Sequence, residues 1–168
     1  MIRFKKRRFL QSLIPVEVDT DFSSFIYTGF ISGNKQTVVS VERTIDLSAN
    51  GSIQNIMMTS FKHKGFTIVY DSTMNEEDAM SLISLCSNKI KKYQYRLNHE
   101  ENKVFVNRYT LGIVIIEIEL NKPLSKLPEY CGVEVTDNTD YDEVNLILMK
   151  NQLREENILR LKNLKNNE

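Results

Sequence analysis

The sequence feature that most constrains the fold is a very apolar run, IIEIEL at 115–120, which contains two glutamates. Glu117 and Glu119 stand two residues apart. Successive side chains of a strand point to opposite faces, so both carboxylates share one face if this run is a strand. Burying two like charges side by side is costly unless cations meet them. We therefore expect a metal ion or the protein's own basic side chains to face this strand. A solvated strand face is the simpler alternative.

Most of the remaining sequence also has the pattern of β-strands. Alternating or β-branched runs are separated by turn signals such as SANG at 48–51 and NHEEN at 98–102. The runs that we interpret as strands lie at about 3–10, 23–33, 36–48, 52–61, 65–72, 89–98, 103–110 and 112–120. Strands joined by short turns are typical of an antiparallel meander.

Two segments have helical periodicity instead. In the first, Ser72 or Thr73 is the expected N-cap, and an apolar stripe follows at Ala79, Leu82, Ile83, Leu85 and Cys86. The second covers about 143–165 at the C-terminal end and carries an apolar stripe from Leu146 onwards. We expect this second helix to pack on the sheet. The alternative is that it forms a homodimer or binds another protein.

Length and composition are those of one globular domain spanning residues 1–168, with 41% hydrophobic and 26% charged residues. The formal net charge is zero, which makes nucleic acid a less favoured partner. No apolar run reaches the ~20 residues of a membrane span. Cys86 and Cys131 have no metal-ligand spacing and are expected to be free thiols. We expect a cytoplasmic protein of bacterial or phage origin.

The charges are nevertheless unevenly distributed. The first eight residues are strongly basic, with Arg3, Lys5, Lys6, Arg7 and Arg8. Residues 129–143 carry only acidic charges, at Glu129, Glu134, Asp137, Asp140, Asp142 and Glu143. The spacing of the acids at 134–143 does not match a calcium-binding loop, so we interpret 134–143 as a loop followed by a helix start.

A succession of short motifs in the last third of the chain carries a family resemblance. It comprises Glu117-Ile118-Glu119-Leu120, Pro128, Gly132, Glu134-Val135-Thr136, Asp140-Tyr141 and Asn145-Leu146. This succession, together with the order of strands and a mid-chain helix, resembles the CYTH family, also called triphosphate tunnel enzymes. KKRRFL at 5–10 and IYTGFIS at 26–32 are similar to the opening strands of that family.

The resemblance implies an α+β fold: an antiparallel eight-stranded β-barrel of CYTH type, whose bore is a tunnel, with a mid-chain helix and a C-terminal helix. It also implies chemistry on triphosphates. Rings of lysine and arginine hold the phosphates in such enzymes, and glutamates coordinate one or two Mg²⁺ or Mn²⁺ ions.

This sequence departs from the family pattern at several of the implied ligands. The family opens with Glu-x-Glu-x-Lys on its first strand, where this chain has Phe4, Lys6 and Arg8. Other basic or acidic positions correspond to Ser40, Glu42, Gln94 and Asn107, whereas Lys92 is retained and Arg96 follows it. Of the implied metal ligands, Glu117 and Glu119 remain. A lysine beside a divalent ion is strongly repulsive.

Two functions follow from these departures. The first is a tunnel protein that has lost catalysis and binds a phosphorylated or polyanionic ligand, or a protein partner. Its anion ligands are Lys6, Arg8, Lys92 and Arg96, with Lys62 and Lys64 as further phosphate contacts. The alternative is an Mg²⁺- or Mn²⁺-dependent triphosphatase that acts on inorganic triphosphate or on nucleoside or RNA triphosphates and binds its metal through Glu117 and Glu119. In the first case the two glutamates pair with Lys6, Arg8 and Lys92.

Overall fold

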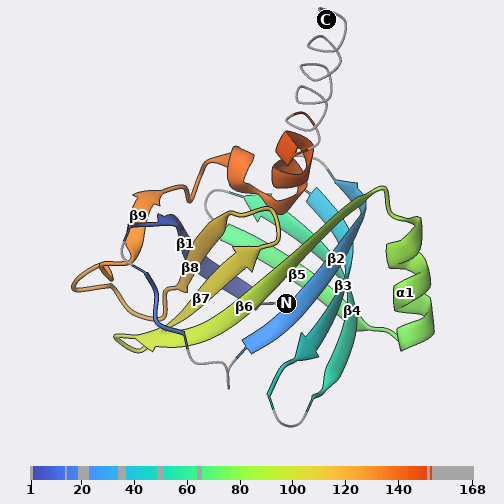
Figure 1. Cartoon of the computed structure of the whole chain (residues 1–168), viewed down its shortest axis with the longest axis horizontal. Helices are drawn as coiled ribbons and strands as arrows, with labels where there is room; N and C mark the ends of the chain where they lie inside the picture. Colours follow the sequence, from blue (N-terminus) through green and yellow to red (C-terminus); the bar gives the residue numbers. More distant parts are fainter. Residues whose placement is uncertain are drawn as a thin grey trace, which may run out of the picture.

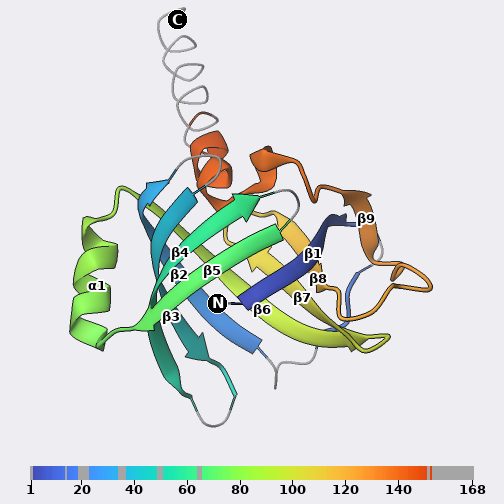
Figure 2. The ribbon, with the colours of Figure 1, turned by 180° about the vertical axis from the view of Figure 1, so that it is seen from behind.

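The structure is a computed structural model that describes residues 2–13, 15–18, 23–33, 37–48, 51–63, 66–150 and 152, with the backbone alone at 2–5, 62, 63, 66 and 67. Nine strands form one antiparallel sheet, which curls around itself (Figures 1 and 2). The strands are β1 (Ile2–Gln11), β2 (Ser23–Gly33), β3 (Thr37–Asp46), β4 (Ile53–His63), β5 (Phe66–Thr73), β6 (Asn88–His99), β7 (Asn102–Tyr109), β8 (Val114–Glu119) and β9 (Cys131–Glu134).

Strand β1 is the only strand of the described sheet that pairs with three others. The sheet order is β5-β4-β3-β2-β6-β7-β8-β1-β9, with an additional β5–β1 pairing. Residues 2–5 of β1 pair with β5, residues 6–10 pair with β8, and Phe9 and Gln11 pair with β9. The predicted α+β class is confirmed. The closed eight-stranded barrel stays a prediction, because nine strands share the sheet and β1 divides its hydrogen bonds among three neighbours.

The sheet has a convex and a concave face, and the alternation of β8 assigns its residues to them. On the convex face, Ile116 and Ile118 are fully buried in a cluster with Phe9, Val104, Val106 and Val16. Glu117 and Glu119 therefore lie on the concave face, as the sequence pattern predicts.

Helix α1 (Glu76–Leu85) packs on the convex face against β2 and β3, where Ala79 and Ile83 are buried beside Val41 (Figure 1). Gly29 of β2 permits this contact, since a Cβ there would lie 3.1 Å from the Cα of Ile83. The N-cap is Asn75, whose side chain accepts a hydrogen bond from the Asp78 amide. The predicted caps, Ser72 and Thr73, are wrong because both residues belong to β5.

A second helical segment starts at residue 143 and is described through 150 and at 152. Its Leu146 and Ile147 are buried on the concave face of the sheet against Phe30, Ile90, Tyr109 and Ile115. The start of the predicted C-terminal helix is thus in place. The remainder of that helix, to 165, and the homodimer predicted through it lie outside the described residues.

Two further predictions concern single features of the chain. Cys86 and Cys131 are both free thiols. Among the residues that the structure describes, no helix is both long enough and apolar enough to cross a lipid bilayer.

Candidate functional site on the concave face

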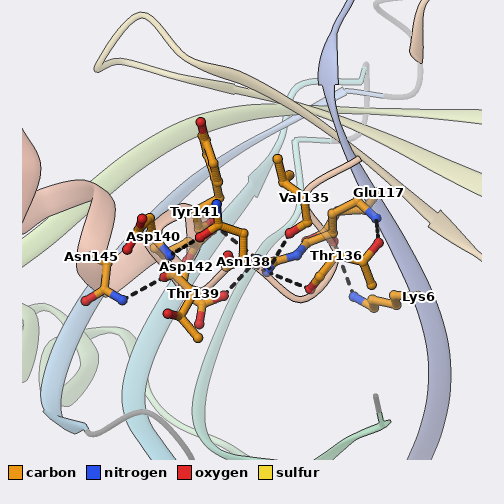
Figure 3. Close-up of polar contacts among 12 residues, drawn as sticks. Lys6, Glu117, Val135, Thr136, Asn138, Thr139, Asp140, Tyr141, Asp142 and Asn145 are labelled. Carbon is orange, nitrogen blue, oxygen red and sulfur yellow. Dashed lines mark hydrogen bonds and ion pairs between the residues drawn. The ribbon is translucent and has the colours of Figure 1, made fainter. Parts of the chain in front are cut away.

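Strand β1 brings two basic side chains against the carboxylates of β8. Lys6 pairs in register with Glu119, and Arg8 with Glu117. The Lys6 Nζ lies 3.3 Å from Glu117 Oε2, to which it donates a hydrogen bond (Figure 3). It also lies 3.7 Å from Glu119 Oε1. The sequence prediction that basic groups face Glu117 and Glu119 is correct for Lys6.

Arg8 reaches past β8 to the loop that precedes the C-terminal helix. Its Nη1 lies 2.9 Å from Asp142 Oδ1 and donates to the Tyr141 carbonyl at 3.2 Å. Its Nη2 donates to the Thr136 carbonyl at 3.1 Å, with Val135 and Asn138 at longer range. Figure 3 shows that Val135, Thr136, Asn138 and Tyr141 of this loop lie close together. The guanidinium, with its fixed fork of donors, therefore holds the loop as well as a carboxylate.

Lys92 of β6 is the most deeply buried basic residue of the site, with 9% of the residue exposed. Its Nζ donates to Glu143 Oε1 at 2.7 Å, and the Tyr109 hydroxyl donates to the same oxygen at 2.8 Å. Glu143 is the first residue of the C-terminal helical segment. The helix start is thus tied to the middle of the sheet through one carboxylate.

The pKa values of these groups show that they form one electrostatic unit. Burial raises the pKa of Glu117, but Lys6, Lys92 and Arg8 lower it by more, to about 2. The Glu117 carboxylate raises the pKa of Lys6 against the effect of burial. Burial lowers the pKa of Lys92, yet Glu143, Glu42 and Glu117 together raise it above its ordinary value. All three ionised forms are therefore favoured at neutral pH.

Glu42 of β3 adds a further carboxyl group to the site. Burial raises the pKa of Glu42, Lys92 opposes that shift, and Glu143 adds to it. Its Oε1 accepts a hydrogen bond from the Thr44 hydroxyl at 3.1 Å. The family resemblance places Glu42 at a position that is basic in the family. This was the one sequence signal that the site contains an additional carboxyl group.

Carboxylates outnumber cations in this network. Lys6, Arg8 and Lys92 face a larger group of acids, namely Glu42, Glu117, Glu119, Asp142 and Glu143. Asp142 and Glu143 come from the acidic segment that we interpreted as a loop and a helix start. That interpretation is right for the backbone. It did not assign either side chain to the site, because only the tertiary fold carries them to β1 and β6.

Arg96, the fourth predicted anion ligand, is not joined to this network. It follows Lys92 by four residues on β6 and is exposed. Within the described part of the chain, no ion pair or hydrogen bond links its side chain to the other site residues. Lys64 and the side chain of Lys62 lie outside the described residues.

Two buried polar groups flank Lys92 and have no hydrogen-bond partner among the residues that the structure describes. They are the Asn107 Nδ2 and the Thr28 Oγ1, on residues that are 0% and 2% exposed. Thr28 pairs with Ile90 and Asn107 pairs with Gln94, so the two stand on either side of Lys92 on the concave face. The other Asn107 atom, Oδ1, accepts from Gln94 Nε2 at 2.8 Å. Unpaired buried polar groups are costly and indicate a place that a bound group or water completes.

The residues of the site do not fit a divalent cation. Glu117 and Glu119 are the retained candidate ligands, but the Lys6 ammonium lies within 4 Å of both. Among the described residues, no group of three or more His, Cys, Asp or Glu side chains is arranged to hold a metal ion. Mg²⁺ and Mn²⁺ favour oxygen ligands and are repelled by an ammonium at this distance.

Comparison with known proteins bears on the fold. No family model matches the sequence. No curated protein matches it either. Among solved structures, the PH1819 protein from Pyrococcus horikoshii OT3 is similar, with a TM-score of 0.50 and 7% identity over 73% of this chain and 80% of that one. A Bacillus halodurans protein described as a "putative adenylate cyclase" also has a TM-score of 0.50, with 13% identity over 73% of this chain and 83% of that one. At these identities the likeness concerns the fold alone, and it is consistent with a CYTH-like fold.

Proposed function

We propose that this protein is a CYTH-like tunnel protein that has lost metal-dependent catalysis and binds a phosphorylated or polyanionic ligand on its concave face. The observation that carries the proposal is the position of the Lys6 ammonium between Glu117 and Glu119. A protein cation stands there in place of a metal ion, so the carboxylates keep a partner although the metal function is gone.

The tunnel itself is part of the proposal. The β5–β1 pairing at residues 2–5 joins strands that stand near opposite ends of the sheet order, and this supports closure into an eight-stranded cylinder with β9 as an addition. The inward residues of such a cylinder come from every strand at alternate positions. Lys6, Arg8, Lys92 and Glu117 would then share one bore.

The ligand chemistry follows from the groups around Lys92. Phosphate oxygens accept charge-assisted hydrogen bonds from lysine and arginine, and neutral donors add to these. Asn107 Nδ2 and Thr28 Oγ1 are unpaired and flank Lys92. In the free protein, Glu143 pairs with Lys92 and Asp142 pairs with Arg8. A phosphorylated ligand would exchange with these carboxylates, and it would bind without a metal.

Hydrolysis by the family mechanism is disfavoured by the same geometry. The alternative, an Mg²⁺- or Mn²⁺-dependent triphosphatase, needs a cation at Glu117 and Glu119 that competes with Lys6. It also needs further carboxylate ligands, and Lys6 and Asn107 stand at two of the positions where the family resemblance implies acids. We therefore expect the protein to bind the ligand without hydrolysing it.

The test measures both properties on the same protein. Phosphate release from inorganic triphosphate and from nucleoside triphosphates is followed with Mg²⁺ and with Mn²⁺, for the wild type and Glu117→Ala. We expect no turnover in either protein. Metal-dependent turnover that disappears in Glu117→Ala would overturn the loss of catalysis.

Binding of inorganic triphosphate without metal is measured by calorimetry. We expect binding by the wild type, and a loss of about tenfold in affinity in Asn107→Ala and in Lys92→Met, because each removes a donor to the ligand. Lys122→Met is the matched control, since Lys122 is exposed and pairs with Glu101 on the surface. Absence of binding by the wild type, or equal losses in all variants, would overturn the ligand assignment.

A further inference from the structure

The convex face carries a strip of aromatic and basic side chains on β2, β6 and β7. In register, Tyr27 faces Lys91, and Phe25 faces Tyr93, which in turn faces Arg108. Strands β2 and β6 lie side by side, and α1 lies to one side of them (Figure 1). On the other side, Arg108 donates to the Val16 carbonyl at 3.4 Å. The strip is therefore bordered by the helix and by the segment at 15–18.

The side chains of this strip contact one another in alternation. The Lys91 Nζ lies 4.7 Å from the centre of the Tyr27 ring, and the Arg108 guanidinium lies 5.0 Å from the Tyr95 ring. The Phe25 and Tyr93 rings pack at 5.2 Å in a tilted arrangement. Cation–π and aromatic contacts of this kind hold side chains against a sheet surface. The strip is thus a pre-ordered surface of rings and charges.

The cations of the strip differ from those of the concave face in their partners. Among the residues that the structure describes, no ion pair joins Lys89, Lys91 or Arg108 to an acidic side chain. Lys89 donates instead to the Ser84 carbonyl at the end of α1. Tyr93 is 42% exposed in the middle of the strip. In the described part of the chain, an exposed ring therefore stands among lysine and arginine side chains that have no carboxylate partner, although the net charge of the chain is zero.

We propose that this strip binds single-stranded nucleic acid. An exposed aromatic ring on a sheet is a stacking platform for a base, and neighbouring lysine and arginine neutralise the phosphates on either side of it. Tyr93 takes the base, while Lys89, Lys91 and Arg108 contact the backbone. An acidic peptide would use the cations but would gain little from Tyr93. A duplex hides the faces of its bases and would likewise leave the ring unused.

The stacking and phosphate contacts lead to expectations for the base preference and the salt dependence of binding. Stacking of one base is sequence-tolerant, so we expect binding without strong base preference. Each phosphate contact with a single strand contributes a slope of about −0.7 to the dependence of log K on log salt concentration. Three such contacts give a slope near −2. Because the strip lies on the opposite face from Lys92, this activity is independent of the proposed triphosphate binding.

The experiment is fluorescence anisotropy with a labelled single-stranded oligonucleotide of mixed sequence, the matching duplex and poly-glutamate as probes. We expect the full chain to bind the single strand with a dissociation constant on the order of 10 µM at low salt, and the other probes more weakly. Tyr93→Ala should reduce the affinity by about tenfold. Lys91→Gln should reduce both the affinity and the salt slope, the latter by about 0.7.

Matched controls come from the same molecule. Tyr70 of β5 is 53% exposed on a different part of the sheet, so Tyr70→Ala should leave binding unchanged, as should Lys122→Gln. Circular dichroism verifies that each variant is folded. No binding of the single strand at low salt, equal binding of poly-glutamate, or equal losses in Tyr70→Ala and Tyr93→Ala would each overturn the proposal. Triphosphate calorimetry is unaffected by any of these results, so the two proposals fail separately.

Discussion

At the scale of single residues, two glutamates show how the surroundings of an ion pair decide its contribution to stability. The pKa of Glu117 and that of Glu134 are both lowered to about 2. For Glu117 the cations of the concave face overcome the effect of burial. For Glu134 the chief cause is the hydrogen bonding from Arg7, whose Nε and Nη2 lie 2.9 and 2.7 Å from the carboxylate. The side chain of Glu117 is 21% exposed and that of Glu134 is 41% exposed.

The first prediction compares Glu117→Gln with Glu134→Gln. We expect Glu117→Gln to lower the free energy of unfolding by about 2–3 kcal/mol at pH 7, because the buried Lys92 and the partly buried Lys6 are left with less compensation. Glu134→Gln should cost less than about 1 kcal/mol, because solvent screens its pair with Arg7. Urea unfolding at pH 7 measures both values, and equal losses would contradict the explanation.

The lowered pKa of Glu117 also predicts how the free energy of unfolding changes with pH. A carboxyl group with a lowered pKa in the folded state stabilises the protein above its ordinary pKa of about 4.5, and this stabilisation is lost as the pH falls toward 2. The free energy of unfolding of the wild type should therefore fall between pH 4.5 and 2. In Glu117→Gln this fall should be shallower. An unchanged slope would show that the pKa of Glu117 is not lowered on folding.

Sequence reasoning predicted part of this network, for a physical reason. Alternation along β8 fixes the shared face of Glu117 and Glu119, whose burial requires a metal ion or basic side chains nearby. The family resemblance, and not the local pattern, implied Lys6, which the structure places there. Asp142 and Glu143 were not predicted, because no local pattern tells to which distant strand a loop side chain reaches. Arg96 was predicted because it shares a face with Lys92 on the strand that the family resemblance assigns to phosphate binding. Alternation gives its face but not its distance from the centre of the site.

At the scale of elements, the loop at 135–142 depends on one side chain of β1. Arg8 contacts several of its carbonyl groups as well as Asp142. The Arg8 carbonyl also accepts from the Val135 amide at 2.8 Å. The C-terminal helical segment begins directly after this loop. The position of that helix is therefore set by a strand more than a hundred residues away in the sequence.

The second prediction is that Arg8→Lys loosens this loop. A lysine keeps the charge opposite Asp142 but lacks the fork that reaches the carbonyl groups. We expect a loss of about 1–2 kcal/mol in unfolding free energy and faster amide exchange at the start of the helix, where Leu146 donates to the Asp142 carbonyl. Hydrogen exchange with mass spectrometry reports the local change.

The neighbouring residue provides the control for this prediction. Arg7→Lys removes a bidentate contact on the surface, between Arg7 and Glu134. It should change the exchange of the helix start little, because Arg7 does not contact the loop carbonyls in the described part of the chain. Equal effects of the two variants would contradict a specific role of the Arg8 guanidinium in holding the loop.

The elements themselves were predicted unevenly. Strand alternation gave β1 to β8 with small errors at the ends, and the apolar stripe gave α1. Strand β9 was missed, because its four residues follow a proline-containing loop and have no alternating pattern long enough to detect. Its place depends on close packing, since a Cβ on Gly132 would lie 2.9 Å from the Leu10 carbonyl oxygen. Contacts of this kind are not readable from a single sequence.

At the scale of the whole molecule, the first four residues of β1 connect regions that are otherwise distant in the sheet. Residues 2–5 pair with β5, while the next residues pair with β8. The sequence resemblance predicted a barrel. Local patterns in the chain give the strands but do not state which edges meet. That information lies in the relative lengths and positions of strands, which a resemblance to a family supplies and alternation does not.

The third prediction concerns a deletion of residues 2–5. We expect the remaining sheet to fold, because β1 keeps its pairing with β8 from Lys6 onward. The amides of β5 that face β1 should exchange faster, and the melting temperature should fall by several degrees, since an edge strand is uncovered. Increased self-association at high protein concentration is expected for the same reason. An unchanged exchange rate in β5 would contradict the β1–β5 pairing.

The alternating charges of β1 also favour one register of this strand in the sheet. Lys6 and Arg8 find acids on one side of the sheet, and Arg7 finds Glu134 on the other. A slip of the strand by one residue would turn the buried Phe9 toward the ion pairs and separate these cations from their partners. The ion pairs on both faces of the sheet thus favour the observed register of β1. A chain that exchanged acids and bases together on β1 and its neighbours should insert the strand equally well.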